Sequence, residues 1–492
     1  MAANPSIQLG TDGNWAIKED NLLAYKKDGT RFFNKEFDFT RGSFATFVDK
    51  DGLIKVSGII DTELVVNGDF ATDSDWFKTT GWSISNGQAI ASTGAYNTLQ
   101  QVFPIVLGKT YEVKFDVTSI TSGSVSMTLG ADSGLQRNQI GSYTEIIEYN
   151  NFFASSGPRS GSGGFVGSID NVSVKEIQTD VPRIDFTDDA TGHLLLEPQS
   201  TNLVVNSENL SVLNQTTINP VISPDVSPSG KLNSWRATRT GSNNRIGSSF
   251  SAVSGLTYTT SIYAKKVSGS GVINITDYQG NPSAYNLTEN WQRYTLTASA
   301  TSTTGRAYVT LQNIGDVVDL YGLQSEQQSF ATSYIPTFSG QYTRLADTCT
   351  GSTDATIFND SEGVLYAEIK ALANDGTFRV ISLSDGTTSN RIWLYYTTVS
   401  NLIQVFDGTT IIAHTIDVTN FIKVAVVYDS NGTRMWVNGS EQGSNSFVGF
   451  SGFDRINFSN SNSSNYYFYG NVKDLRYYDT ALTDAELTEL TT

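Results

Sequence analysis

Residues 423–441 read KVAVVYDSNGTRMWVNGSE, two runs of alternating side chains, each followed by an Asn–Gly pair. Alternation with a period of two is typical of an antiparallel strand with one face in the core and one in solvent. The pairs Asn431–Gly432 and Asn438–Gly439 favour tight turns, because Asn and Gly adopt positive φ at low cost. The stretch therefore predicts a β-hairpin.

The same alternation recurs in other segments bounded by Gly, Asn, Asp or Ser. They are Thr110–Val117 (TYEVKFDV), Thr257–Ala264 (TYTTSIYA) and Arg391–Tyr396 (RIWLYY). Helical periodicity is confined to Leu482–Leu490, where Thr483 and Asp484 are candidate caps. Aromatic residues make up 11% of the chain, which suits β-sheets. We predict an all-β protein of tandem β-sandwich and jelly-roll domains with almost no helix.

Charge and cysteine content narrow the class of protein. The 492 residues include 32 Lys and Arg against 49 Asp and Glu, a formal net charge of −17, which argues against nucleic-acid binding. Cys349 is the only cysteine, which excludes an intrachain disulfide and fits folding in a reducing cytoplasm. The N-terminal residues lack the pattern of a secretory signal, and no run of about twenty apolar residues predicts membrane insertion.

A weak internal repeat organises the first two thirds of the chain. The first copy runs from LVVNGDF (Leu64–Phe70) to SIDNVSVKEI (Ser168–Ile177), and the second from NLVVNSENL (Asn202–Leu210) to VVDLYGLQSEQ (Val317–Gln327). The strand density of both copies predicts two related β-sandwiches. We expect four units: an N-terminal attachment segment (1–60), a first sandwich (61–179), a second sandwich with a linker module (180–347) and a jelly roll (348–492).

No catalytic constellation stands out. His193 and His414 are the only histidines and fall in different expected units, which favours structural roles. The spacings HExxH, GxSxG and the Walker loop are absent, as is a Cys–His pairing. A glycosidase needs two carboxylates across a cleft, and none of the many acidic residues is singled out. We expect no enzyme activity, and polysaccharide degradation is the least favoured alternative.

Two segments each place a Trp beside an Arg on the expected solvent face of a strand, opposite apolar neighbours. Exposed aromatic rings stack on sugar rings, and Arg donates hydrogen bonds to sugar hydroxyls. The candidate glycan contacts are Arg391, Trp393 and Tyr395 in one segment, Arg434 and Trp436 in the other, and Trp76 as a lesser candidate. The alternative that these aromatics cover a subunit interface or a neighbouring strand stays open. Core or sheet-packing positions are favoured for Trp82, Trp235 and Trp291.

Two of these units resemble known domains. The C-terminal unit resembles concanavalin A-like (laminin-G-like) jelly rolls through the hairpin quoted above and the closing YFYGNVKDLRYYDTALTDAEL, residues 467–487. The first repeat resembles carbohydrate-binding-module sandwiches of the "NGDF…W…IDNVSVKE" kind at Asn67–Phe70, Trp76, Trp82 and Ile169–Glu176. Such sandwiches often hold a structural Ca²⁺, and the resemblance implies Asp69, Asp73, Asp75 and Asp170 as its candidate ligands.

Four further phrases resemble a module of tailed-phage virion appendages of the tail-fibre or head-fibre type. They are FTRGSFATFVDKDGLI (Phe39–Ile54), PRIDF (Pro182–Phe186), LLLEPQSTNL (Leu194–Leu203) and ATSYIPTFSGQYTRLAD (Ala331–Asp347). In that family the first two phrases are close neighbours. We therefore interpret Ile59–Val181 as an inserted sandwich, since lengthening a loop costs entropy only logarithmically.

The resemblance to virion proteins also implies a function. It implies a protein made in the host cytoplasm without a signal peptide and incorporated in the virion as a homotrimer. The N-terminal segment would contact other virion proteins, and the lectin-like domain would bind a host-surface glycan. A purely structural capsid-decoration or tail-assembly protein without ligand binding is the alternative.

Overall fold

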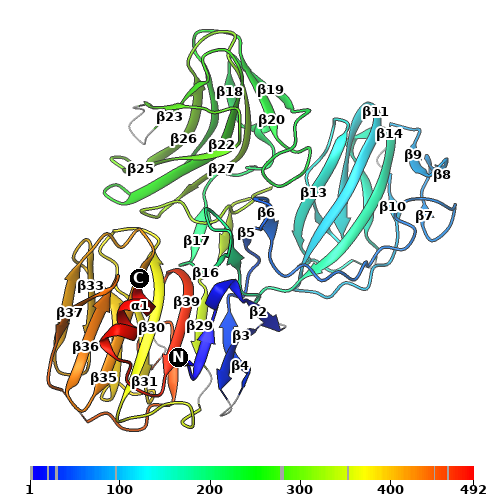
Figure 1. The fold of residues 1–492 in the computed structure, drawn as a ribbon. Coiled ribbons are helices and arrows are strands. Elements are labelled where there is room, and N and C mark those ends of the chain that lie inside the picture. Colours follow the sequence, from blue (N-terminus) through cyan, green and yellow to red (C-terminus); the bar gives the residue numbers. More distant parts are fainter. Residues whose placement is uncertain are drawn as a thin grey trace.

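The computed structural model describes residues 4–18, 21–27, 31–94, 97–153, 155–276, 282–338, 340–351, 354–447, 449–462 and 465–492, without the side chain of Phe33. Three large β-units surround a small central set of strands (Figure 1). In this part of the chain α1 is the only α-helix, and the predicted all-β class is confirmed. No helix among the described residues is long and apolar enough to cross a membrane.

The first sandwich is organised around two long antiparallel strands, β11 (Thr110–Leu129) and β14 (Gly157–Ile177). Register shifts along this pair mark β-bulges, which bend both strands. Its core includes Trp82, which is 6% exposed, so the predicted core position of this residue is confirmed. The other strands are β7 (Phe77–Lys78), β8 (Trp82–Ser85), β9 (Gln88–Ala91), β10 (Leu99–Gln100), β12 (Asp132–Ser133) and β13 (Gly141–Glu148).

The second sandwich consists of two antiparallel sheets in the strand orders β18-β21-β26-β23-β24 and β19-β20-β27-β22-β25. Alternation along TYTTSIYA places Tyr258, Ile262 and Ala264 in the core between them, with Trp235 beside them. The strands are β18 (Asn214–Thr216), β19 (Ile218–Ile222), β20 (Trp235–Arg239), β21 (Arg245–Ser251), β22 (Thr257–Ser268), β23 (Val272–Thr276), β24 (Pro282–Asn286), β25 (Gln292–Ser299), β26 (Thr304–Leu311) and β27 (Val317–Glu326). A 3₁₀ turn, η2 (Leu210–Val212), precedes them.

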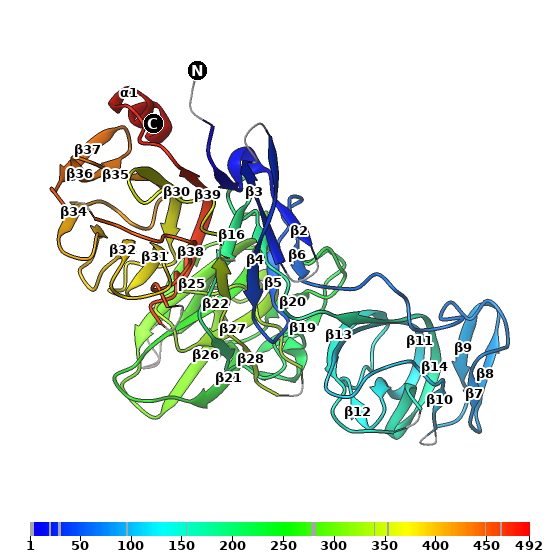
Figure 2. The same ribbon diagram turned by 90° about the horizontal axis from the view of Figure 1, so that it is seen from below.

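The C-terminal jelly roll has two layers, paired in the orders β37-β36-β35-β30-β39 and β34-β33-β32-β31-β38 (Figure 2). Large aliphatic and aromatic side chains fill the space between the layers. The strands are β30 (Gly363–Ala371), β31 (Arg379–Ser384), β32 (Arg391–Tyr396), β33 (Leu402–Phe406), β34 (Ile411–Thr415), β35 (Ile422–Asp429), β36 (Gly432–Val437), β37 (Ser440–Ser444), β38 (Arg455–Asn457) and β39 (Gly470–Tyr478).

The chain ends in helix α1 (Asp484–Thr491), as predicted from the capping residues. The Thr483 side chain accepts a hydrogen bond from the Glu486 N–H, and the Glu486 carboxylate accepts one from the Thr483 N–H. This reciprocal capping box satisfies donors at the start of the helix that would otherwise lack partners. The helix packs on the outer side of β35 and β36 (Figure 2).

The N-terminal residues extend the jelly roll, contrary to the expected separate attachment segment. Strand β1 (Ile7–Leu9) pairs with β39, and β4 (Phe32–Thr40) pairs with β29 (Thr348–Gly351). Strand β3 (Asn21–Lys27) pairs with β1, β4 and β2 (Ala16–Lys18), and the 3₁₀ turn η1 (Thr11–Gly13) lies between β1 and β2. Pairing between residues more than 300 positions apart leaves no signal in local alternation, so the sequence pattern did not predict it.

The four virion-like phrases converge on the short strands at the centre of Figure 1. These strands are β5 (Thr46–Val48), β6 (Ile54–Val56), β15 (Ile184–Asp185), β16 (His193–Leu196), β17 (Ser200–Asn202) and β28 (Tyr342–Arg344). Each phrase supplies at least one charged residue to a buried ion network, called the hub network below. Its members are Arg41, Arg183, Glu197, Arg344 and Asp347, all at most 3% exposed.

Arg183 is the centre of the hub network. Its guanidinium is 2.7 Å from the Glu197 carboxylate and also binds Asp347. Arg41 lies 3.2 Å from the other carboxylate oxygen of Asp347, and Arg344 lies 3.5 Å from Glu197. Burying charges costs several kcal/mol per ion, and these contacts pair every charge of the network, although Nε of Arg183 and Nε of Arg344 have no hydrogen-bond partner.

The two ends of the first sandwich leave the central strands at one point. Ile59 forms an isolated bridge with Ile177, and the Gln178 N–H donates to the Gly58 carbonyl at 2.7 Å. Gly58 has φ of +78°, and a Cβ at this position would lie 2.0 Å from the Gln178 oxygen, so only glycine fits. Arg41 donates to the Thr179 carbonyl on the returning chain. An insertion needs this adjacency of its two ends.

We predict that the hub network loses stability in acid. Burial alone would raise the pKa of Glu197, but Arg344, Arg183 and hydrogen bonds from Ser333 outweigh burial and lower the pKa from 4.5 to about 2. Because the pKa of Glu197 is lower in the folded state than in the unfolded state, its ionised carboxylate stabilises the folded protein above about pH 5. This contribution is lost as pH falls from about 5 towards 2. The shift corresponds to about 3 kcal/mol. Hydrogen exchange of residues 193–197, compared between pH 5 and pH 2.5, measures this loss of stability.

Glu197→Gln is the matched variant for this pH dependence. It cannot ionise, so we expect the exchange of residues 193–197 to change less between the two pH values than in the wild type. An identical pH dependence in both proteins would contradict the assignment of this stability to Glu197.

Candidate functional site

Strand β32 presents polar and aromatic side chains on the outer face of the jelly roll. Ile392 and Leu394 point into the core and are fully buried, whereas Arg391 and Trp393 on the opposite face are half-buried. The alternation of RIWLYY therefore predicted correctly which of these side chains face the core and which face outward. Tyr395 shares the outer face but is only 6% exposed and stacks against Phe378, so the prediction that it contacts a glycan is wrong.

Neighbouring strands and loops complete an aromatic surface around Trp393. Phe406 of β33 pairs across from Trp393, and the two ring centroids are 5.9 Å apart. Tyr466 stands 6.3 Å from Trp393 at a steep angle and is 47% exposed. Phe378 stacks on Tyr395 with centroids 5.8 Å apart. We call this surface, made of Phe378, Arg391, Trp393, Tyr395, Phe406 and Tyr466, the β32 face.

Arg391 carries a free cation on the β32 face. Its guanidinium carbon lies 4.2 Å from the centroid of Trp393 and 5.1 Å from that of Phe406, which places it over both rings. Its buried Nε has no hydrogen-bond partner, and no carboxylate among the described residues forms an ion pair with it. Burial lowers the pKa of Arg391 from its ordinary value, as expected for a cation without a counter-charge. The N–H donors of its two terminal nitrogens remain available to a ligand.

A hydrogen bond fixes the position of the Trp393 ring. Its Nε1 donates to the Ser461 hydroxyl at 3.0 Å. Tyr466 adopts φ of +52°, a conformation that bulky residues rarely take and that is associated with functional sites.

Sequence reasoning missed Phe378, Phe406 and Tyr466. The alternation of Leu402–Phe406 could have placed Phe406 on this face, whereas loop residues carry no such signal.

The predicted contact pair on β36 is wrong. Trp436 is 6% exposed and lies in a small core with Leu482 and Leu487 of the C-terminal segment. Arg434 forms ion pairs with Asp429 at 3.5 Å and with Asp484 at 2.8 Å. Both side chains do lie on the outer face, but helix α1 covers that face. The element that covers this pair is a helix, not the subunit interface or neighbouring strand of the alternative.

Trp76 is also not available for stacking. It is 6% exposed, and its ring packs at 5.4 Å from Phe70 and 6.1 Å from Phe103. Its Nε1 donates to the Asn67 carbonyl at 2.9 Å, so both the ring and the polar atom are satisfied inside the first sandwich. The prediction that Trp76 contacts a glycan is therefore wrong.

The four acidic residues implied as Ca²⁺ ligands do not form a site. Asp73 pairs with Lys78, and Asp75 accepts from the Ser74 hydroxyl at 2.5 Å. Asp170 accepts from the Asn171 N–H, and Asp69 from the Ala71 N–H. Nowhere in the described chain are three His, Cys, Asp or Glu side chains grouped to hold a metal ion. The residues present do not fit a Ca²⁺ ion, which needs six to eight oxygens.

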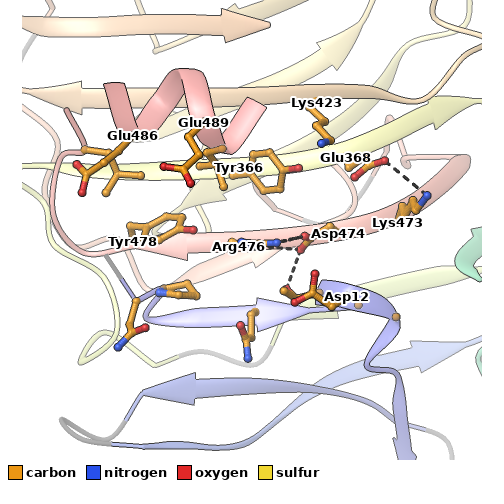
Figure 3. A pocket seen from close by; sticks show the side chains of 18 of the residues that line it. Asp12, Tyr366, Glu368, Lys423, Lys473, Asp474, Arg476, Tyr478, Glu486 and Glu489 are labelled. Carbon is orange, nitrogen blue, oxygen red and sulfur yellow. Dashed lines mark hydrogen bonds and ion pairs between the residues drawn. The ribbon is translucent and has the colours of Figure 1, made fainter. Parts of the chain in front are cut away.

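A second candidate is a groove of about 580 Å³ between the N-terminal segment, β30, β39 and helix α1 (Figure 3). Glu368 of β30 stands directly opposite Asp474 of β39, and burial raises the pKa of both carboxyl groups. A pair of facing carboxyl groups, one of which has a raised pKa, is a feature of glycosidase sites.

Five carboxyl groups line this groove, and the facing pair, Glu368 and Asp474, is engaged by neighbouring side chains. Asp474 accepts from the Thr11 hydroxyl at 2.8 Å and from Arg476 at 2.6 Å, and Lys473 lies 3.8 Å from Glu368. The aromatic residues of the groove, Tyr366 and Tyr478, are at most 3% exposed and offer no ring to a sugar. The β32 face has the partly exposed aromatic rings that the groove lacks.

Comparison with known proteins agrees with this architecture. Residues 341–488 match the concanavalin A-like lectin/glucanases superfamily. The C-terminal unit is therefore a concanavalin A-like jelly roll, as its closing residues predicted. The matched segment begins near β28 and ends inside α1, so it contains β32 and the rest of the β32 face. No curated protein sequence matches the chain.

Solved structures with similar folds include the CBM40 of the Ruminococcus gnavus IT-sialidase bound to α2,3-sialyllactose. That match has 18% identity, covers 28% of this chain and 86% of that chain, and has a TM-score of 0.25. Domain 4 of AbnA, a GH43 extracellular arabinanase from Geobacillus stearothermophilus in complex with arabinotriose, is 17% identical over 31% of this chain and 77% of that chain, with a TM-score of 0.25.

The N-terminal CBM22 tandem domain of Paenibacillus barcinonensis Xyn10C matches a larger share of the chain. It covers 54% of this chain and 98% of that chain at 12% identity, with a TM-score of 0.20. None of these three structures is described as a virion protein.

Proposed function

We propose that the protein is a non-catalytic adhesin whose jelly roll binds a glycan on the β32 face. The observation that carries the proposal is Arg391, a cation without a partner that lies over Trp393 and Phe406. The apolar side of a sugar ring packs against the half-exposed aromatic rings, and the guanidinium donates hydrogen bonds to hydroxyl or acidic oxygens at the ring edge. Few precisely placed polar groups on an aromatic surface are typical of small-ligand sites.

We expect weak binding at each β32 face. Multivalency makes such sites useful, because several copies held together bind a surface far more tightly than one copy does. This fits the proposed setting, a tailed-phage virion appendage that carries several identical chains. The setting is supported by the four phrases that resemble virion proteins and supply the hub network. Labelled antibody on intact particles and sedimentation of the purified chain test the location and the expected homotrimer.

A screen of the full-length protein on a glycan array tests the proposed binding. The full chain is needed because β1 and β4 complete the jelly roll. We expect binding to one class of surface glycan without release of reducing ends, since the facing carboxyl groups of the groove, Glu368 and Asp474, are both engaged. A protein that binds no glycan would favour the purely structural alternative. Release of reducing ends that is lost in Glu368→Gln would favour the enzyme.

A further inference from the structure

A cleft of about 630 Å³ lies where the second sandwich, the central strands and the jelly roll meet. Its walls come from β5 and β16 at the centre, β22 and β25 of the sandwich, and β30 and β39 of the jelly roll. In Figure 1 this is the junction between the green sandwich and the jelly roll. Ligand sites commonly occupy domain interfaces, and this volume lies within their usual range of roughly 300–1,000 Å³.

Three residues that line this cleft carry a buried polar atom without a partner. His193 is 3% exposed and Asn471 is 8% exposed, and they lie on the paired strands β16 and β39. His193 Nδ1 and Asn471 Oδ1 have no hydrogen-bond partner within the protein, and neither has Nε of Arg293 across the cleft. Buried polar groups in folded proteins are almost always satisfied, so three unsatisfied atoms around one cavity point to a partner outside the chain.

Aromatic rings form part of the same wall. Trp291, expected to be a core or sheet-packing residue, is half-buried and borders the cleft. Its Nε1 donates to the Val226 carbonyl at 2.8 Å, and Lys265 Nζ lies 5.6 Å from the ring centroid, so the indole is held in place. Tyr263 lies beside it, under the Arg293 guanidinium carbon at 5.3 Å.

The charges around the cleft are balanced. Arg293 and Lys370 contribute two cations, and Asp185 and Asp188 contribute two carboxylates. The third carboxylate of the lining, Glu197, is already neutralised by Arg183 and Arg344 of the hub network. A ligand with a strong charge of either sign would meet like charges, whereas a neutral polyhydroxylated ring meets donors, acceptors and an aromatic wall. We propose that this cleft is a second ligand site and binds a neutral saccharide of one or two rings. The proposal is independent of the β32 face.

The test uses full-length protein carrying Trp393→Ala, which removes the binding expected on the β32 face. Lactose, maltose, cellobiose and N,N′-diacetylchitobiose are titrated into it by calorimetry. We expect at least one of them to bind, and Asn471→Leu to weaken that binding at least tenfold. Leucine is close to asparagine in shape, so this variant keeps the packing. Trp291→Ala tests the aromatic wall in the same way, and Asn150→Leu on the first sandwich is the matched control without effect.

Three outcomes would overturn this second site. The first is that none of the four disaccharides binds the Trp393→Ala protein. The second is that binding persists unchanged in both Asn471→Leu and Trp291→Ala. The third is that crystals grown with the bound disaccharide contain ordered water only in the cleft. Loss of array binding in Trp393→Ala bears on the β32 face alone, so failure of one proposal is distinguishable from failure of the other.

Discussion

Replacing Arg183 with methionine will lower the local stability of the central strands by about 3–5 kcal/mol, the usual cost of removing one partner from a buried ion pair. The Arg183 side chain is 0% exposed and binds Glu197, Asp347, the Thr46 carbonyl and the Ser333 hydroxyl. Methionine fills most of the space but leaves two carboxylates buried without their main cation. The effect is large because both carboxylates stay buried and lose the cation that compensates for their desolvation. More than a single contact is therefore lost.

Hydrogen exchange followed by mass spectrometry on residues 193–197 measures this loss, because a chain of several units does not unfold in one step. The Leu195 N–H donates to the Arg183 carbonyl at 3.0 Å and reports on this region. We expect protection to fall by a factor of about 100 or more. Lys18→Met is the control, since the Lys18–Glu36 pair is 60% and 45% exposed and such pairs contribute at most about 1 kcal/mol. Equal effects of the two variants would contradict the role of the hub network.

Trp393→Ala will weaken glycan binding by about 30-fold or more. Removing the central aromatic side chain of a binding surface commonly costs about 2 kcal/mol or more, which corresponds to this factor. Trp393 is the ring in contact with Arg391, Phe406 and Tyr466, so alanine removes both the stacking surface and the support of the cation. Titration of the full-length variant with the glycan identified on the array measures the loss.

Two further variants make this result specific. Trp393→Phe keeps a ring and should retain part of the affinity, with a loss smaller than that of alanine. Phe152→Ala removes an aromatic side chain that is 77% exposed on the first sandwich, and we expect unchanged binding. If Phe152→Ala weakened binding as much as Trp393→Ala, the glycan would not be bound by the β32 face.

Local patterns predicted the strands and the capped helix, because alternation and capping depend on residues close in sequence. They also assigned Arg391 and Trp393 correctly to the outer face of β32. The same rule led to the wrong prediction that Trp436 contacts a glycan. Alternation tells which side of a strand a residue occupies but not which element covers that side. The addition of β1 and β4 to the jelly roll depends on contacts between distant segments and therefore could not be read from the pattern.

The hub network was predicted only in part, because the sequence singled out its residues but not their pairing. Its five residues were all inside phrases that the sequence singled out, from FTR to TRLAD. Their charge made burial unexpected, because Arg, Asp and Glu are rarely buried unless paired. Only the three-dimensional arrangement shows that residues of four separate phrases pair with one another. Likewise, nothing in the sequence indicated that Trp291 lines a cleft between two units.

A crystal structure of the full-length protein with the glycan identified on the array tests the central claim most directly. The account predicts a sugar ring lying on Trp393, with a ring oxygen or hydroxyl within hydrogen-bond distance of the Arg391 guanidinium. A glycan bound in the groove between Glu368 and Asp474, with the β32 face bare, would contradict it.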